Sequence, residues 1–432
     1  MKRELILCFA LAVAGGFFGG GASAPCRAAA VAPEGLHFIR IHMVDSKNGW
    51  AQAGAPEDHR VLHTANGGVS WVDVTPHTLP NRPWDFQFPS SRIAWISSYN
   101  QKTGFLLTTN AGASWVSWAP LVPPDDTHNY FLVVANCRLL NARDGLAECV
   151  DGAAGSSCYT FFDTHDGGLH WEAVRITPPG RNPENPPEAV PVSNALWYGA
   201  GITYYPPGKV ALVHGDLTEG KPEGMVCLSL STNLGRSWRD LKLPLPEKHH
   251  GSFCQPSAPF FLDASNGLLR VCAFKSMTDT GALDRVTIFY ATHDGGGTWT
   301  PMPGTFSPRD PFSDHKLSFV SPRDIFVENG GTLYVTHDGA QSWRASNLGL
   351  GLRETGHDVS QMEFVDAAHG WIAVSGQGGT WASGHRTFYA YATVYETFNG
   401  GETWTELPLR VDQEANKREQ RDEHQPERNF TQ

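Results

Sequence analysis

Short apolar runs alternate with turns of glycine, asparagine, aspartate and hydroxyl residues along most of the chain. The clearest example is residues 292–299, with the sequence THDGGGTW. Its first threonine and its aspartate can hydrogen-bond nearby backbone N–H groups, and its glycines can adopt the positive φ of a tight turn. The final threonine and tryptophan suit a half-buried extended segment. The pattern therefore predicts a strand, a tight turn and a second strand.

The same pattern, Ser/Thr-x-Asp/Asn-x-Gly-x-Ser/Thr-Trp, occurs seven times. Its copies span residues 64–71, 108–115, 164–171, 231–238, 292–299, 336–343 and 397–404. The positions predicted to be structural are Asn66, Trp71, Asn110, Trp115, Asp166, Trp171, Asn233, Trp238, Asp294, Trp299, Asp338, Trp343, Asn399 and Trp404. Two copies depart from the pattern, with Ala340 in place of glycine and His170 in place of the hydroxyl residue. We expect these two turns to be strained or differently hydrogen-bonded.

A second pattern precedes most copies of the turn. Residues 43–50 and 364–371 are close copies of it and residues 261–268 a weaker one, each with turn residues between two apolar runs. Two hairpins per unit give four strands, and the tryptophans that end successive copies lie 44 to 67 residues apart. Four-stranded units that recur at this spacing indicate a β-propeller with loop insertions. We predict an all-β fold, a seven-bladed β-propeller of four-stranded antiparallel blades.

The repeated turn resembles the Asp-box, or bacterial neuraminidase, repeat. The two patterns together read F-x-D-x-x-x-G-W followed by T-x-D-G-G-x-T-W. Over essentially the whole mature chain the arrangement is most similar to the photosystem II stability/assembly factor family. That resemblance implies an exported binding or scaffold propeller without catalysis. A more distant similarity to sialidase-like propellers implies the alternative, a glycoside hydrolase. The string nearest to the sialidase Arg-Ile-Pro motif is residues 38–42, which lacks the proline.

The ends of the chain differ from its middle. Lys2 and Arg3 precede an apolar run and the small residues 22–24, which is the layout of a secretory signal peptide. We predict a signal peptide at residues 1–30, the propeller at 31–410 and a charged tail at 411–432 that buries too little apolar surface to order. The protein is expected to be exported, periplasmic or extracellular, with no membrane span in the mature chain.

The charge of the chain bears on its possible partners, and its cysteines bear on disulfide and metal sites. The formal net charge of −11 opposes binding of nucleic acid. Six cysteines remain beyond the signal peptide and its border, and in an exported chain they can form disulfides. The best candidates are Cys149 with Cys158, which flank turn residues, and Cys254 with Cys272. The chain has no C-x-x-C pair, and we predict neither a metal site nor a cofactor.

The long insertions are predicted to share one face of the propeller, opposite the repeated turns. Loops gathered at one end of a rigid scaffold commonly bind ligands, so we expect a protein or glycan partner there. The ligand-binding candidates in these insertions are Asp126, His128, His249, His250, Arg309, His315, Arg353, His357, His385 and Arg386. Arg309, Arg353 and Arg386 could clamp a carboxylate. Asp314 and Asp358 are the catalytic candidates if the protein is a hydrolase, which needs two carboxyl groups across one pocket.

Overall fold

The computed structural model describes most of the chain between residues 36 and 412. The described ranges are 36–55, 58–79, 83–98, 105–118, 132–139, 143–153, 156–166, 170–174, 202–205, 209–214, 225–232, 239–257, 259–274, 285–306, 316–376, 380–382, 385–387 and 392–412. The predicted signal peptide and residues 413–432 of the predicted tail lie outside these ranges.

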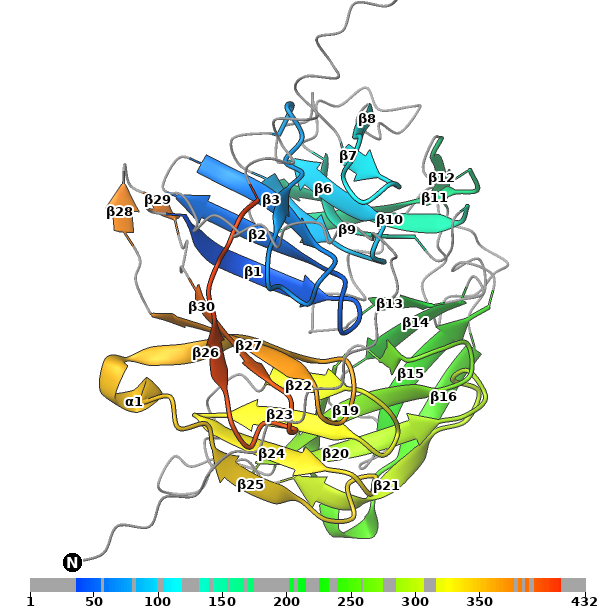
Figure 1. Cartoon of the computed structure of the whole chain (residues 1–432). Coiled ribbons are helices and arrows are strands. Elements are labelled where there is room, and N and C mark those ends of the chain that lie inside the picture. Colours follow the sequence, from blue (N-terminus) through cyan, green and yellow to red (C-terminus); the bar gives the residue numbers. More distant parts are fainter. Residues whose placement is uncertain are drawn as a thin grey trace, which may run out of the picture.

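The described chain is nearly all β and is built mainly from antiparallel meanders of four strands (Figure 1). The first and last meanders join into one eight-stranded sheet through the pairing of Phe38 with Ala392. The first sheets contain β1 (His37–Met43), β2 (Gly49–Ala55), β3 (Asp58–Thr64) and β4 (Val72–Asp73); β5 (Pro83–Gln87), β6 (Ala94–Ser98), β7 (Phe105–Thr108) and β8 (Val116–Trp118); β9 (Leu132–Leu139), β10 (Gly145–Ala153), β11 (Ser156–Thr164) and β12 (Glu172–Val174); and β13 (Ile202–Tyr205), β14 (Lys209–His214), β15 (Met225–Ser231) and β16 (Arg239–Pro244).

The remaining sheets follow the same order. They contain β17 (Phe253–Pro256), β19 (Gly267–Phe274), β20 (Arg285–Thr292) and β21 (Thr300–Phe306), with the short β18 (Phe260–Phe261) on β19; β22 (Lys316–Phe319), β23 (Ile325–Asn329), β24 (Thr332–Thr336) and β25 (Arg344–Asn347); and β26 (His357–Phe364), β27 (Gly370–Gly376), β30 (Ala392–Thr397) and β31 (Thr405–Leu407). A small hairpin, β28 (Thr380–Ala382) and β29 (His385–Thr387), stands apart.

The repeated turn has one hydrogen-bond pattern. Oγ1 of Thr292, which is fully buried, accepts the N–H of Gly296 at 2.9 Å and donates to Oδ1 of Asp294 at 2.8 Å. The same Oδ1 accepts the N–H of Thr298 at 2.9 Å. Burial opposes the charge of Asp294, but the bonds from Thr298 and Thr292 outweigh it and lower its pKa to about 2. Equivalent bonds form at residues 64–71, 108–115, 336–343 and 397–404.

The two departures from the pattern behave differently. Ala340 has a φ of 65°, yet its N–H still donates to Oγ1 of Thr336, so this turn keeps its bonds and carries backbone strain. His170 is differently bonded, because Nδ1 of its ring lies 2.6 Å from Oδ2 of Asp166, in place of the usual hydroxyl. Ala111 has a φ of 62° and is a further strained site that the sequence analysis missed.

Ala111→Gly should stabilise the protein. A left-handed conformation costs a residue with a Cβ atom about 1–2 kcal/mol, and glycine removes most of that cost. We expect the free energy of unfolding in urea to rise by about 0.5–1 kcal/mol. Ala113 lies two residues later and does not have a positive φ. Ala113→Gly should therefore lower the free energy of unfolding slightly. Equal losses for both variants would show that the strain at Ala111 is not real.

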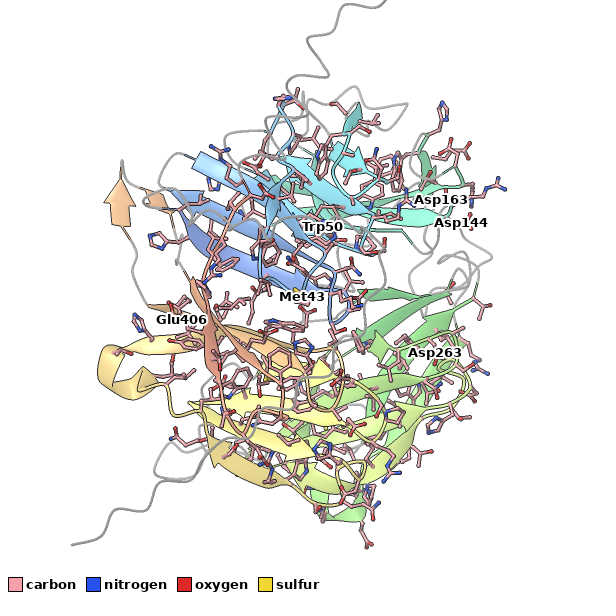
Figure 2. The ribbon with its side chains drawn as sticks, viewed as in Figure 1. Met43, Trp50, Asp144, Asp163, Asp263 and Glu406 are labelled. Carbon is pink, nitrogen blue, oxygen red and sulfur yellow. The ribbon has the colours of Figure 1, made fainter. Side chains whose placement is uncertain are left out.

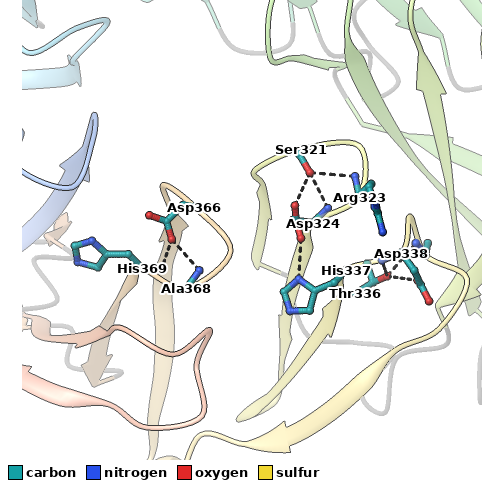
Figure 3. Close-up of polar contacts among 10 residues, drawn as sticks. Ser321, Arg323, Asp324, Thr336, His337, Asp338, Asp366, Ala368 and His369 are labelled. Atoms are coloured by element: carbon teal, nitrogen blue, oxygen red, sulfur yellow. Dashed lines mark hydrogen bonds and ion pairs between the residues drawn. The ribbon is translucent and has the colours of Figure 1, made fainter.

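Both turns of a sheet meet at one end of it. The N–H of Gly67 donates to the carbonyl of Lys47 at 2.7 Å, and matching bonds join the paired turns of other sheets. Figure 3 shows two further examples of these turns, with His337 against Asp324 and with Asp366 accepting the N–H groups of its own turn. We call this end of the sheets the turn face. The opposite end, which carries residues 246–252, 330–331 and 347–356, is the loop face.

The sheets follow one another around the molecule, and the last lies beside the first (Figure 1). The first strands of neighbouring sheets are in contact, as for β22 with β26 and β1 with β26. The chain ends also meet: the N–H of Trp71 donates to the carbonyl of Arg410 at 2.8 Å, and the N–H of Asp412 to that of Trp71 at 2.7 Å. Val411 is predicted to belong to the polar tail, but it is buried in a core cluster with Trp71.

In neither of the two predicted disulfide pairs do the cysteines lie directly opposite each other. Cys254 lies opposite Ala273 and Cys272 opposite Gln255, so the two side chains project to opposite faces of the sheet and form no disulfide. Burial, with a smaller contribution from Cys272, raises the pKa of the Cys254 thiol to about 11. In the hairpin of β10 and β11, Cys149 lies opposite Thr160 and Cys158 opposite Asp151, two positions out of direct register.

Candidate functional site

Three first strands, β1, β5 and β26, line a cavity of about 500 Å³. It lies toward the turn face, because its lining residues stand at the ends of strands that lead into turn-face turns. Its polar lining residues are Arg40, His42, Gln87, Gln361 and Glu363, and its apolar ones include Phe86, Phe88, Met362 and Trp371. Alternate positions of β1 and of β26 supply four of the polar groups, as expected for side chains on one face of a strand.

An ion pair joins two of these strands. Nδ1 of His42 lies 2.7 Å from Oε1 of Glu363, with side chains 40% and 27% exposed. The His42 ring also bonds the backbone of Phe88. Glu363 and the backbone of Phe88 both favour the protonated form of the ring. Burial alone would lower the pKa of His42, but Glu363 and Phe88 outweigh it, and also outweigh Arg40, so the pKa is raised.

This ion pair predicts a pH dependence of stability. The pKa of His42 in the folded state lies above its unfolded value of about 6.5. The stabilisation that His42 contributes to the fold is therefore fully present below about pH 6.5 and is lost as the pH rises through the folded-state pKa. His42→Gln removes the titrating group. The difference in melting temperature between wild type and His42→Gln should therefore be largest at about pH 6 and shrink toward about pH 9. A difference that is constant or grows with pH would contradict the assignment.

Polar side chains of the first strands also bridge successive sheets. Oε1 of Gln361 accepts the N–H of Ile41 at 3.0 Å, and Oε2 of Glu363 accepts the N–H of Met43 at 2.8 Å. Figure 2 labels Met43 where β1 meets the sheet of β26. Oγ of Ser318 similarly accepts the N–H of Phe364. Both oxygens of Glu363 are therefore engaged in holding the first sheet to the last.

A second carboxyl group of interest lies near the loop face. Glu328 is 4% exposed, and its Oε1 accepts the N–H of Gly331 at 2.8 Å. Burial raises its pKa to about 7; the bond from Gly331 and the charge of Lys316 oppose the rise, and the charge of Asp358 adds to it. A smaller cavity of about 260 Å³ is lined by Gly330, Gly331 and residues 347–352. Glu328 is not among its lining residues.

The structure describes only some of the predicted site residues. His249 ends the short helix η2 (Glu247–His249), His250 follows it, and Arg353 lies in α1 (Leu352–Thr355). His357 and Asp358 are exposed at the start of β26, and His385 and Arg386 are in β29. By the direction of the neighbouring strands, these described residues lie toward the loop face. Outside the described residues lie Asp126, His128, Arg309, Asp314, His315, Asn233 and Trp238. Their predicted roles stay predictions.

The pocket residues were missed by the sequence analysis. The sequence of residues 38–42 predicts nothing beyond an incomplete match to a sialidase motif, and that of residues 361 and 363 predicts no site. One sequence feature could have indicated them: polar residues occur at alternate positions shortly before a turn of the turn face. These are residues 40 and 42 in one strand and residues 361 and 363 in the other. Glu328 precedes the turn residues Asn329-Gly330-Gly331, and no pattern in the sequence distinguishes it from an ordinary hairpin residue.

Among the residues that the structure places, no group of three or more His, Cys, Asp or Glu side chains could hold a metal ion. Within the same ranges, no helix is both long enough and apolar enough to cross a bilayer.

Comparison with known proteins gives structural likenesses only. No family model and no curated protein sequence matches the chain. Among solved structures it is similar to YCF48 from Cyanidioschyzon merolae, at 15% identity and a TM-score of 0.45, over 87% of this chain and 99% of that one. It is similar to a xyloglucanase from Xanthomonas campestris (13% identity, TM-score 0.38, 85% and 60% covered) and to an α-L-arabinofuranosidase from Fusarium graminearum (12%, 0.37, 84% and 94%). At these values the likenesses assign no function.

Proposed function

We propose that this protein is an exported, noncatalytic, seven-bladed β-propeller that binds a protein or glycan ligand. The observation that carries the proposal is the cavity between β1, β5 and β26, a mixed polar and apolar pocket of a size typical of ligand sites. Among the described lining residues, the carboxyl group is that of Glu363, which accepts a hydrogen bond on each oxygen.

The blade count rests on the strand order. Four-stranded meanders begin with β1, β5, β9, β13, β17, β22 and β26, and the first and last of them join into one eight-stranded sheet through the pairing of β1 with β30. Seven copies of the repeated turn in the sequence agree with this number. Contacts of Trp71 with Arg410 and Asp412, and of Gln361 and Glu363 with β1, support closure of the sheets into a ring.

The pocket chemistry favours binding over hydrolysis. A glycoside hydrolase of the usual kind places two carboxyl groups on either side of the scissile bond, one as an acid and the other as a base or nucleophile. Glu363 has no carboxyl partner among the described lining residues, and its bonds to His42 and to the backbone of Met43 give it a structural task.

A hydrolase remains the second candidate because of one observation at the loop face. Glu328 has a pKa of about 7, suited to a general acid at neutral pH, and lies within electrostatic range of the exposed Asp358. In that case the substrate would have to reach a carboxyl group that is 4% exposed and bonded to Gly331.

One pair of measurements separates the two candidates. The purified mature protein is screened against neutral, carboxylated and sulfated oligosaccharides for both binding and release of reducing ends, and is used in parallel as bait in an envelope extract. We expect saturable binding without product release. Turnover that is lost in Asp358→Asn, Glu328→Gln or Asp314→Asn would overturn the noncatalytic assignment. Absence of both a glycan and a protein ligand would overturn the binding assignment itself.

A further inference from the structure

Residues 347–356, which join β25 to β26 at the loop face, contain three backbone pivots. Gly349, Gly351 and Gly356 have φ values of 72°, 60° and 68°, in the left-handed region that favours glycine. A Cβ atom added at Gly349 or Gly356 would meet nothing within 4 Å. The backbone therefore has room to change direction near both ends of these residues, which we call the glycine segment.

Two leucines hold the glycine segment against the neighbouring sheets. Leu348 and Leu352 are 5% and 8% exposed, and they belong to the core cluster that contains Phe326, Leu333 and Val359. The segment also lines the cavity of about 260 Å³ at the loop face. Apolar burial thus keeps the segment in place, although its contact with the sheets is not close-packed throughout.

Glu328 lies next to these leucines. It stands two positions after Phe326 in β23, so both side chains project from the face of the strand that packs in this cluster. Its Oε1 accepts the N–H of Gly331 at 2.8 Å, and the carbonyl of Gly331 accepts the N–H of Leu348 at 3.0 Å. A short chain of hydrogen bonds therefore links the carboxyl group to the glycine segment.

A charge on Glu328 opposes this closed arrangement. Burial, to which the charge of Asp358 on β26 adds, outweighs the bond from Gly331 and the charge of Lys316, which lies opposite on β22. β24 contributes no charged residue. The other charged or titratable residues of the glycine segment and of the adjoining end of β26 are Arg353, Glu354 and His357.

The direction of the pH effect follows from this burial. If the glycine segment moves away, water reaches Glu328 and its pKa returns from about 7 toward the ordinary 4.5. The closed form therefore binds the proton more tightly than the open form does. The resulting stabilisation of the closed form is fully present below about pH 4.5 and is lost as the pH rises through about 7.

We propose that residues 347–356 form a pH-sensitive lid at the loop face, which is closed beside the end of β23 while Glu328 is protonated and opens when Glu328 carries a charge. Opening uncovers Glu328 and the start of β26. The cavity at the lid shares no lining residue with the pocket between β1, β5 and β26. The lid therefore goes beyond the proposed binding function and does not depend on it.

Hydrogen–deuterium exchange of the mature protein tests the lid. Wild type and Glu328→Gln are compared at the same pH, so intrinsic exchange rates cancel. The substitution keeps an oxygen for the Gly331 N–H but cannot ionise. Peptides that cover residues 347–356 should exchange about fivefold or more faster in wild type than in Glu328→Gln at about pH 8, and equally in both at about pH 5.

Two further variants make the comparison specific. Glu406→Gln is the matched control, because it removes an exposed carboxylate from β31 and should change exchange of the lid by less than about twofold. Lys316→Gln removes a charge that favours ionised Glu328, so the pH at which the lid opens should move upward. This shift is measured on a chain that retains Glu328, and it tests the lid even if Glu328→Gln does not fold.

Three results would overturn the lid. The first is equal exchange of wild type and Glu328→Gln at about pH 8, where the two should differ most. The second is a difference that extends over β23 and β24, because the whole sheet and not one segment would then be opening. The third is an opening pH that stays fixed or falls in Lys316→Gln, which would show that another group titrates. None of these results bears on ligand binding between β1, β5 and β26, which its own screen tests.

Discussion

Replacing Trp71 with alanine should lower the free energy of unfolding by about 3–5 kcal/mol, the range for deleting a large buried aromatic. Trp71 is 0% exposed and packs edge-to-face on Phe38 with ring centroids 5.7 Å apart. It also belongs to the core cluster that includes Leu407 and Val411. The substitution therefore opens a cavity where the last segment of the chain meets the first sheet.

Trp115→Ala provides the comparison, since Trp115 holds the same position in the next copy of the turn. It is only half-buried, although its indole N–H donates to the carbonyl of Val74 at 2.7 Å. Urea unfolding of both variants should give a clearly smaller loss for Trp115→Ala. If the two losses were equal, the repeated tryptophans would act alike and the meeting of the chain ends would add nothing to stability.

Glu363→Ala should be the next most damaging change, with a loss of about 2–3 kcal/mol. It removes the acceptor of the buried Met43 N–H and the partner of His42 in one step. Solvent screens the pair with His42, whose side chain is 40% exposed, so most of the loss should come from the backbone N–H. Glu363→Gln can still accept that bond and should lose less.

A double-mutant cycle apportions the effect. Urea unfolding of His42→Gln, Glu363→Ala and the double variant at about pH 6 should give a coupling energy of about 0.5–1 kcal/mol, and a smaller one at about pH 9. Strictly additive losses at both values would mean that the ion pair contributes no stability.

The local parts of the fold could be predicted from the sequence because their causes lie within eight residues. Thr292, Asp294 and Gly296 bond to one another inside a single turn, so the pattern alone indicates the conformation. His170 could be recognised as a departure for the same reason. Ala111 was missed because it occupies a position without a fixed residue, although that position also has a positive φ.

The pocket could not be found in this way because its contacts join distant segments. Gln361 bonds Ile41 and Glu363 bonds Met43, from opposite ends of the chain. Register shifts in β1 after Phe38, in β5 after Pro83 and in β26 after Val359 also interrupt simple alternation just before the pocket residues. A bulge changes which face later side chains occupy, so counting from the start of a strand gives the wrong residues.

Errors with the cysteines and with Val411 have similar origins. Two cysteines on neighbouring strands are placed by a register that sequence spacing does not determine, and an offset of one residue puts Cys254 and Cys272 on opposite faces of their sheet. Val411 stands at the start of a polar run, and its burial depends on Trp71.

The pairing of residues 410–412 with Trp71 has a kinetic consequence. The partners of this contact are the first and the last parts of the propeller to leave the ribosome, so the first sheet cannot gain its final neighbour until synthesis is nearly complete. Joining such distant segments carries a large loop-closure entropy, which slows the step that forms them. An incomplete nascent chain thus stays open along one seam, with the indole of Trp71 uncovered, until its carboxyl end arrives.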